Sequence, residues 1–239
     1  MENQDKRRKL PGALFALVIG LGYLTALATL VLSHIGADGD PAFSNHDIVV
    51  SFAGDPKLTR LTVMVKGTMR EHLKTEDELN TILGWVDAGA LEKDFPPVYD
   101  VMDKRCQKCH NPFGKASFAP LTTYEEVAEF TGPNTGMSFD RLANLSHQHL
   151  FGMGLLVLAL SLVLWFQTPF GGMIKTALVL LGFGGEICDI GGWWLMKLSP
   201  HFLYMTLAGG AMMGTFFGVT IALIWYDVVF GKGTWKDAS

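Results

Sequence analysis

Clustered basic residues are scarce in this chain of 239 residues, which carries 19 Lys and Arg against 23 Asp and Glu and has a formal net charge of -4. A surface that binds nucleic acid needs several Lys and Arg side chains gathered against the phosphates. Beyond the first few residues the sequence offers no such group. We therefore expect no nucleic-acid partner.

Motifs for hydrolysis and group transfer are missing as well. The sequence has no nucleophile with an adjacent base, no phosphate-binding glycine loop and no paired carboxylates in its polar part. Its three cysteines are too few for a disulfide framework. The sequence therefore gives no case for a hydrolase or a group-transfer enzyme.

Hydrophobic residues are abundant instead, at 49% of the chain, with a mean hydropathy of +0.26. Four apolar runs are each long enough to cross a bilayer, which takes about 20 helical residues. The first run lacks the short apolar core and the clear cleavage site of a secretory signal, so we expect a retained anchor. The four predicted spans are Leu10–Ser33, Leu145–Phe166, Met173–Leu198 and Phe202–Phe230.

The basic residues at positions 6–9 predict the orientation, because Lys and Arg beside a span stay on the cytoplasmic side. This rule places residues 1–9 and 231–239 in the cytoplasm and residues 34–144 outside. The expected fold is mainly α: a four-helix transmembrane bundle, residues 10–33 and 145–230, in the cytoplasmic (inner) membrane. A small extracytoplasmic domain is inserted between its first and second helices.

The segment 34–144 is the only part with a soluble composition. Two short strands are predicted in it, Asp47–Phe52 and Leu61–Val65. A helix is predicted over Thr75–Ala88, because Thr75 can cap it, a glutamate follows three residues on, and its apolar residues fall on one face.

The run Cys106-Gln107-Lys108-Cys109-His110 follows a further predicted helix over Val98–Lys104. Its spacing matches covalent haem attachment, in which both thiols form thioethers at one edge of the ring and the adjacent histidine ligates the iron. The alternatives are a redox dithiol, which needs no following histidine, and half of a zinc site, which needs another Cys or His pair nearby. The predicted location outside the cytoplasm favours haem c.

Segments around this motif resemble small class I-like cytochrome c domains. In that family a Gly-x-Met segment supplies the second iron ligand, and a helix ends in Trp-x-x-x-Gly-Ala; both follow the attachment site. Here they precede Cys106, so the outer domain resembles a circularly permuted member. The resemblance implies a membrane-anchored c-type cytochrome with one haem. It rests on Gly67-Thr68-Met69, Thr75-Glu76-Asp77-Glu78-Leu79 and Trp85-Val86-Asp87-Ala88-Gly89-Ala90.

By this match Met69 is the expected sixth ligand, since a thioether completes a low-spin haem of higher potential that suits electron transfer. His72, three residues on, is the nearest rival and would give a bis-histidine haem of lower potential. Met102, Met137, His46 and an open site are the remaining alternatives.

Histidines in the membrane part raise the question of a second cofactor. His149 and His201 are both expected near the outer face, and they are the candidate axial pair of a b-type haem. The competing interpretations are that these histidines cap helices, that they hydrogen-bond to the outer domain, or that they hold copper.

Other polar and small residues also stand out in the predicted spans. Carboxylates are costly there, and Glu186 and Asp189 share one helix face. We expect them to take up protons from a quinol, to bind another subunit, or to hydrogen-bond within the bundle while protonated. Gly210, Gly214 and Gly218 repeat every four residues, which favours close packing against another helix.

These observations lead to one expected function and two alternatives. The first is a membrane-bound c-type cytochrome that passes electrons between a membrane donor, such as quinol, and an extracytoplasmic partner within a larger electron-transfer complex. The second is a quinol-oxidising subunit with haems b and c, and the third is a mainly scaffolding subunit of a respiratory or photosynthetic complex. The expected partners are other membrane redox subunits, an extracytoplasmic donor or acceptor, and quinone.

Overall fold

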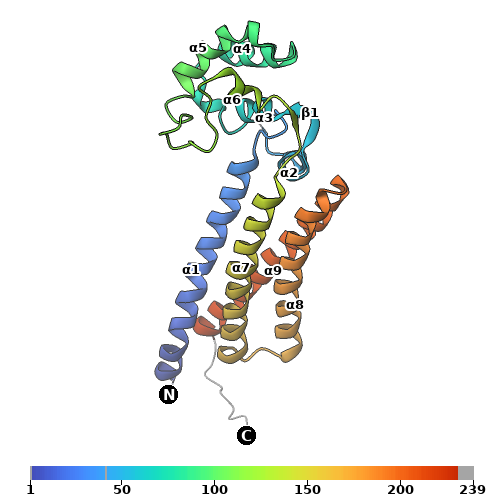
Figure 1. The fold of residues 1–239 in the computed structure, drawn as a ribbon. Coiled ribbons are helices and arrows are strands. Elements are labelled where there is room, and N and C mark those ends of the chain that lie inside the picture. The colour runs from blue at the N-terminus through green and yellow to red at the C-terminus, as the bar shows by residue number, and fades with distance from the viewer. Residues whose placement is uncertain (1, 41, 231–239) are drawn as a thin grey trace. The chain divides into compact units, whose positions relative to one another are not determined.

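The computed structural model describes residues 2–40 and 42–230, with side chains from residue 7 onward (Figure 1). The predicted cytoplasmic C-terminus, with Lys232 and Lys236, lies outside the described residues. The described chain is mainly helical and forms two compact units. We call them the helical unit, Met1–Thr29 with Phe139–Ser239, and the intervening unit, Leu30–Ser138.

Four long helices build the helical unit, and a short 3-10 helix, η3 (Pro200–Phe202), joins the last two. Three helical stretches are long and apolar enough to cross a membrane: Arg7–His34, Phe139–Gln167 and Pro200–Phe230. The helix that carries both Glu186 and Asp189 is not among them, so a fourth span stays a prediction. The four helices are α1 (Glu2–His34), α7 (Phe139–Gln167), α8 (Gly172–Met196) and α9 (Leu203–Phe230).

Apolar side chains from all four helices share one core. Two alanines of α1 are fully buried, which brings that helix close to its neighbours, and the Tyr23 ring stacks on Phe217 with centroids 4.6 Å apart. The helix α1 is therefore an integral part of the helical unit. The buried residues are Ala13, Ala16, Val157, Leu160, Leu164, Leu178, Met213, Phe216, Phe217 and Ile224.

The closest helix contact lies between α8 and α9, where glycines let the backbones meet. A Cβ added to Gly209 would lie 2.3 Å from the backbone nitrogen of Asp189. A Cβ added to Gly210 or Gly218 would meet no atom within 4 Å, so among the described residues these two glycines do not pack against a helix of the same chain. One residue turns a helix by about 100°, which moves the contact from Gly210 to its neighbour.

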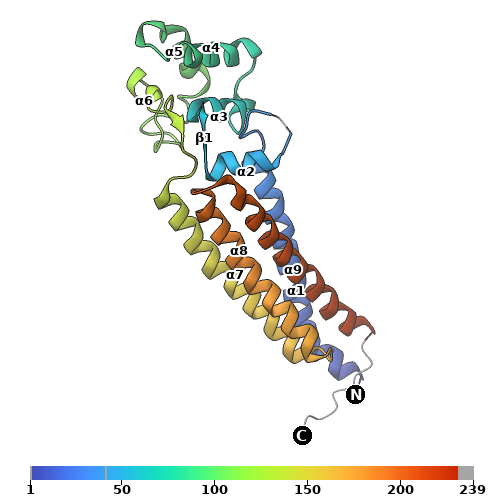
Figure 2. The same cartoon turned by 90° about the vertical axis from the view of Figure 1, so that its right-hand side faces the viewer.

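The intervening unit is built from short elements, and Figure 2 shows its two longest helices, α4 and α5, side by side. Its strands β1 and β2 pair antiparallel. The elements are α2 (Asn45–Phe52), β1 (Asp55–Thr59), α3 (Arg60–Lys66), η1 (Arg70–His72), α4 (Glu76–Asp87), η2 (Glu92–Asp94), α5 (Pro96–Arg105), α6 (Tyr124–Ala128) and β2 (Pro133–Asn134).

Both predicted strands are wrong, because the residues concerned form α2 and α3. Ser44 caps α2 by accepting hydrogen bonds from the backbone of His46 and Asp47, and the Asp47 carboxylate accepts one from the Ser44 backbone in return. Thr59 caps α3 in the same way through the Thr62 backbone. Each cap satisfies backbone donors at a helix start, which outweighs the strand preference of the valines and isoleucine that follow.

The predicted helix over 75–88 is confirmed as α4, whose Thr75 Oγ1 accepts the Glu78 backbone N–H at 3.2 Å. It packs against α5 through buried Ile82, Trp85 and Val98. The connection between the two helices is short, so they run antiparallel. The cysteine motif begins where α5 ends.

Candidate functional site

The cysteine motif winds into a single turn after α5. Cys106 is the C-cap residue of that helix, and its backbone nitrogen donates to the Met102 carbonyl. The Cys106 carbonyl then accepts from the backbone nitrogens of both Cys109 and His110, at 3.0 and 2.9 Å. Both cysteines are free thiols, Cys106 partly buried and Cys109 exposed. The local backbone therefore places Cys106, Cys109 and His110 on one turn.

The chain after the motif folds back over it. The Ala116 nitrogen donates to the Cys109 carbonyl at 2.9 Å, and the Leu121 nitrogen donates to the His110 carbonyl at 3.0 Å. A Cβ on Gly114 would lie 2.2 Å from the Cys109 carbonyl oxygen, so only glycine fits at that approach. These bonds hold the loop against His110.

The His110 ring is fixed by the same loop, because its Nδ1 lies 2.8 Å from the carbonyl oxygen of Ala119. A carbonyl can only accept, so Nδ1 carries the proton and Nε2 of the neutral ring keeps its lone pair. Metal-binding histidines commonly hold their tautomer in this way, through a backbone carbonyl. The Nε2 lone pair is thus left available for a metal ligand bond.

The surroundings of Cys106 bear on the alternative uses of the motif. Burial raises the pKa of Cys106 to about 11, and the Glu78 carboxylate adds to the shift. A redox dithiol needs the opposite, a lowered thiol pKa. Within residues 2–40 and 42–230, no group of three His, Cys, Asp or Glu side chains is gathered as a metal site, so a zinc site finds no further ligands there. Two free thiols and an imidazole whose Nδ1 is held by a backbone carbonyl are the groups that covalent haem attachment needs.

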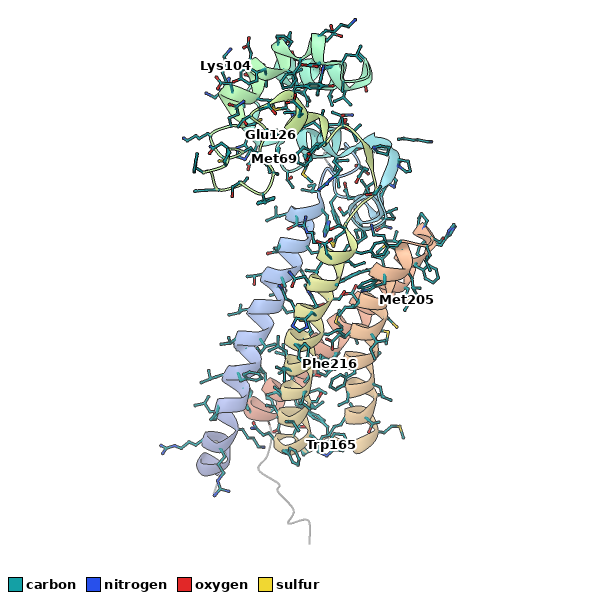
Figure 3. The ribbon with its side chains drawn as sticks, in the orientation of Figure 1. Met69, Lys104, Glu126, Trp165, Met205 and Phe216 are labelled. Carbon is teal, nitrogen blue, oxygen red and sulfur yellow. The ribbon has the colours of Figure 1, made fainter. Side chains whose placement is uncertain are left out.

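The two rival sixth ligands lie around η1, in different surroundings, and Figure 3 labels the first of them, Met69. Met69 is partly buried directly before η1, and its backbone nitrogen donates to the Met64 carbonyl. His72 is exposed, with its Nε2 3.8 Å from a Glu71 carboxylate oxygen. Met102 is fully buried in the core and packs there. Met69 stays the predicted ligand.

The predicted haem b ligands have separate surroundings. The His149 Nδ1 lies 2.9 Å from the Leu145 carbonyl oxygen, and its ring meets the Trp193 ring edge-on with centroids 5.1 Å apart. His201 is exposed, and its Nδ1 lies 3.2 Å from the Ser199 hydroxyl. In the described part of the chain no hydrogen bond or ring contact joins the two histidines, and a haem b between them stays a prediction.

The two carboxylates of α8 are both drawn into the helical unit. Glu186 is 4% exposed and faces Gly154 of α7, where an added Cβ would lie 3.5 Å from its Oε2. Asp189 accepts a hydrogen bond from the Trp193 indole at 3.2 Å. A functional role for the two carboxylates stays a prediction.

Three buried charged residues of the helical unit were not singled out from the sequence as interacting groups. The Lys9 ammonium lies 2.9 Å from the Asp227 carboxylate, and both side chains are buried. The Lys175 ammonium donates to the backbone carbonyls of Trp165 and Thr168, at 2.9 and 2.7 Å, and so closes the end of α7. The sequence did offer a signal for these contacts, because each of the three charged residues lies inside or beside an apolar run.

Comparison with known proteins supports a membrane protein. A family described as a transmembrane helical domain matches residues 124–234, a little under half of the chain. The matched range begins at α6, includes α7, α8 and α9, and leaves out the cysteine motif. Neither a curated protein nor a solved structure matches the chain.

Proposed function

We propose that this chain is a membrane-bound c-type cytochrome, with haem held by thioethers to Cys106 and Cys109 and by coordination to His110. The observation that carries the proposal is the 2.8 Å contact between His110 Nδ1 and the Ala119 carbonyl, within a Cys-Gln-Lys-Cys-His run. The haem iron, when bound, supplies one-electron chemistry.

The surrounding residues position the two thiols and the imidazole. Arg105, next to the first cysteine, donates from Nε and Nη2 to one Glu78 oxygen, at 2.8 and 2.6 Å. This pair ties the end of α5 to the start of α4. Met69 completes the iron coordination in this proposal, with His72 as its rival, and sets the potential through its thioether.

The membrane role follows from the helical unit. We propose four spans, with α8 as the third, and the intervening unit on the extracytoplasmic side of the cytoplasmic membrane. The match of residues 124–234 to a transmembrane helical domain, which includes α8, supports the membrane part. Electrons then pass between a membrane donor, such as quinol, and an extracytoplasmic partner, within a larger electron-transfer complex.

Intact-mass measurement of cysteine variants tests this function. The full chain, made in a host with a working c-type maturation system, is expected to carry the mass of one haem under denaturing conditions. The double variant Cys106→Ala/Cys109→Ala should lose it, whereas Cys188→Ala, which removes a cysteine of α8, should keep it. A chain of apoprotein mass in the wild type, or haem retained by the double variant, would contradict the proposal.

A further inference from the structure

A line of polar side chains runs along the contact between α7 and α8. At one end the Trp194 indole donates to the Ser146 hydroxyl at 2.9 Å, and the next contact is the His149 ring against Trp193. Deeper along the pair, Glu186 faces Gly154. Residue numbers increase along α7 from Ser146 to Gly154 while those of their partners on α8 decrease from Trp194 to Glu186. The two helices therefore run antiparallel.

Glu186 ends this line inside the helical unit. Eight residues separate Gly154 from Ser146, which at about 1.5 Å per residue puts the carboxylate about 12 Å deeper than that serine. Its Oε1 is buried and has no hydrogen-bond partner among the described residues. A buried carboxylate with an unpartnered oxygen carries a large desolvation cost while it is charged, and binding a proton removes that cost.

Among the described residues, the two buried amines of the helical unit have partners other than Glu186. The buried amines of the unit are engaged elsewhere, since Lys9 pairs with Asp227 and Lys175 binds carbonyls at the end of α7. The titratable residues on the surrounding helices include His149 on α7, Asp189 on its own helix and Tyr23 on α1. The titratable residues of α9 are Tyr204, Tyr226 and Asp227, toward its two ends.

We propose that Glu186 is a proton-binding site within the helical unit, and that its proton exchanges with the solution at the end of α7 that holds His149. In this exchange the Glu186 carboxylate accepts one proton and becomes a neutral acid. It releases that proton to Asp189, one turn nearer to the same end, and from there to the solution. No electron moves, so the proposal does not depend on bound haem.

Infrared difference spectroscopy of the full chain in lipid nanodiscs tests the resting state. A carbonyl band of a protonated carboxylic acid is expected at neutral pH, and E186Q should remove it. D227N should keep the band, because it leaves Glu186 in place and changes a carboxylate that pairs with Lys9. If E186Q fails to fold, wild-type chain labelled with 13C at its glutamate carboxyls replaces it, and the band must shift. A band that is absent, or unmoved by the variant and the label, would overturn the proposal.

The rate of deuterium exchange at that band tests the route. D189N is expected to slow exchange several-fold, because it removes the next proton acceptor. S161A is the matched control, since Ser161 is a buried residue of α7 on the other side of Gly154, bonded to the Val157 carbonyl. An exchange rate in D189N equal to that of the wild type, or slowing by S161A instead, would overturn the route.

Discussion

The imidazole Nδ1 of His110 and the carbonyl oxygen of Ala119 lie 2.8 Å apart, nine residues along the chain. Because the acceptor is a backbone atom, no substitution of the Ala119 side chain removes it. The orientation of the ring therefore depends on the path of the loop, which is held by the bonds from Ala116 and Leu121 to the motif. In the proposed cytochrome, this loop would fix which ring nitrogen faces the iron.

Replacement of Met69 tests the sixth ligand. Met69→Leu removes the sulfur at nearly constant volume, so we expect a haem that leaves the low-spin state and a midpoint potential that shifts. His72→Leu is the matched control and should leave the absorption and electron paramagnetic resonance spectra unchanged. The opposite pattern would identify His72 as the ligand.

The Glu78–Arg105 pair predicts a pH dependence of stability. Hydrogen bonds from Arg105 hold the pKa of Glu78 below its usual 4.5. The folded state therefore binds this proton less readily than the unfolded one, and the pair stabilises the fold above about pH 4.5. That contribution is lost as the pH falls through the lowered pKa.

Thermal unfolding of Glu78→Gln between neutral and acid pH measures this contribution. The variant should melt below the wild type at neutral pH, and the difference should vanish in acid. Glu92→Gln, an exposed change in η2, serves as the control and should follow the wild type throughout. A deficit of Glu78→Gln that persists at low pH would show that charge is not its cause.

Adjacent glycines of α9 predict opposite outcomes for the same substitution. Gly209→Ala puts a Cβ 2.3 Å from the Asp189 backbone, so α8 and α9 must separate. Overpacking of this kind costs about 1–3 kcal/mol of unfolding free energy. Gly210→Ala meets open space and should be neutral or stabilise by up to about 1 kcal/mol through helix propensity. Unfolding in detergent compares the two variants, and equal effects would refute the assigned contact face.

The buried Lys9–Asp227 pair predicts that single and double variants differ. Lys9→Met leaves a buried carboxylate uncompensated, which costs about 3–5 kcal/mol. Lys9→Met/Asp227→Leu removes both charges and should recover most of that loss. The unfolding free energies of the single variant, the double variant and the wild type test this expectation. A double variant less stable than Lys9→Met would contradict it.

The sequence predicts the long helices well, because apolar runs leave few alternatives to a buried or membrane helix. Helix α4 was also predictable, since Thr75 and its apolar face point to the same element. The strand predictions over 47–52 and 61–65 failed because short β-branched runs suit either element. Ser44 and Thr59, the capping residues just before them, decide for helix.

The candidate site was predictable only where its residues are neighbours in sequence. Cys106, Cys109 and His110 stand in one motif, whereas the acceptor for the imidazole is a backbone carbonyl, which no side-chain pattern reveals. The pair of Lys9 and Asp227 joins the first and the last long helix. Helix packing brings these two residues together, and no spacing in the sequence predicts it.

A pyridine haemochrome spectrum of the purified full-length chain, before and after acid-acetone extraction, tests the central claim most directly. We predict one haem c per chain that stays with the protein after extraction. An additional extractable haem b would add a second redox centre and would support His149 and His201 as its candidate ligands. A chain without covalent haem, made in a host with a working c-type maturation system, would contradict the proposal that this protein is a cytochrome.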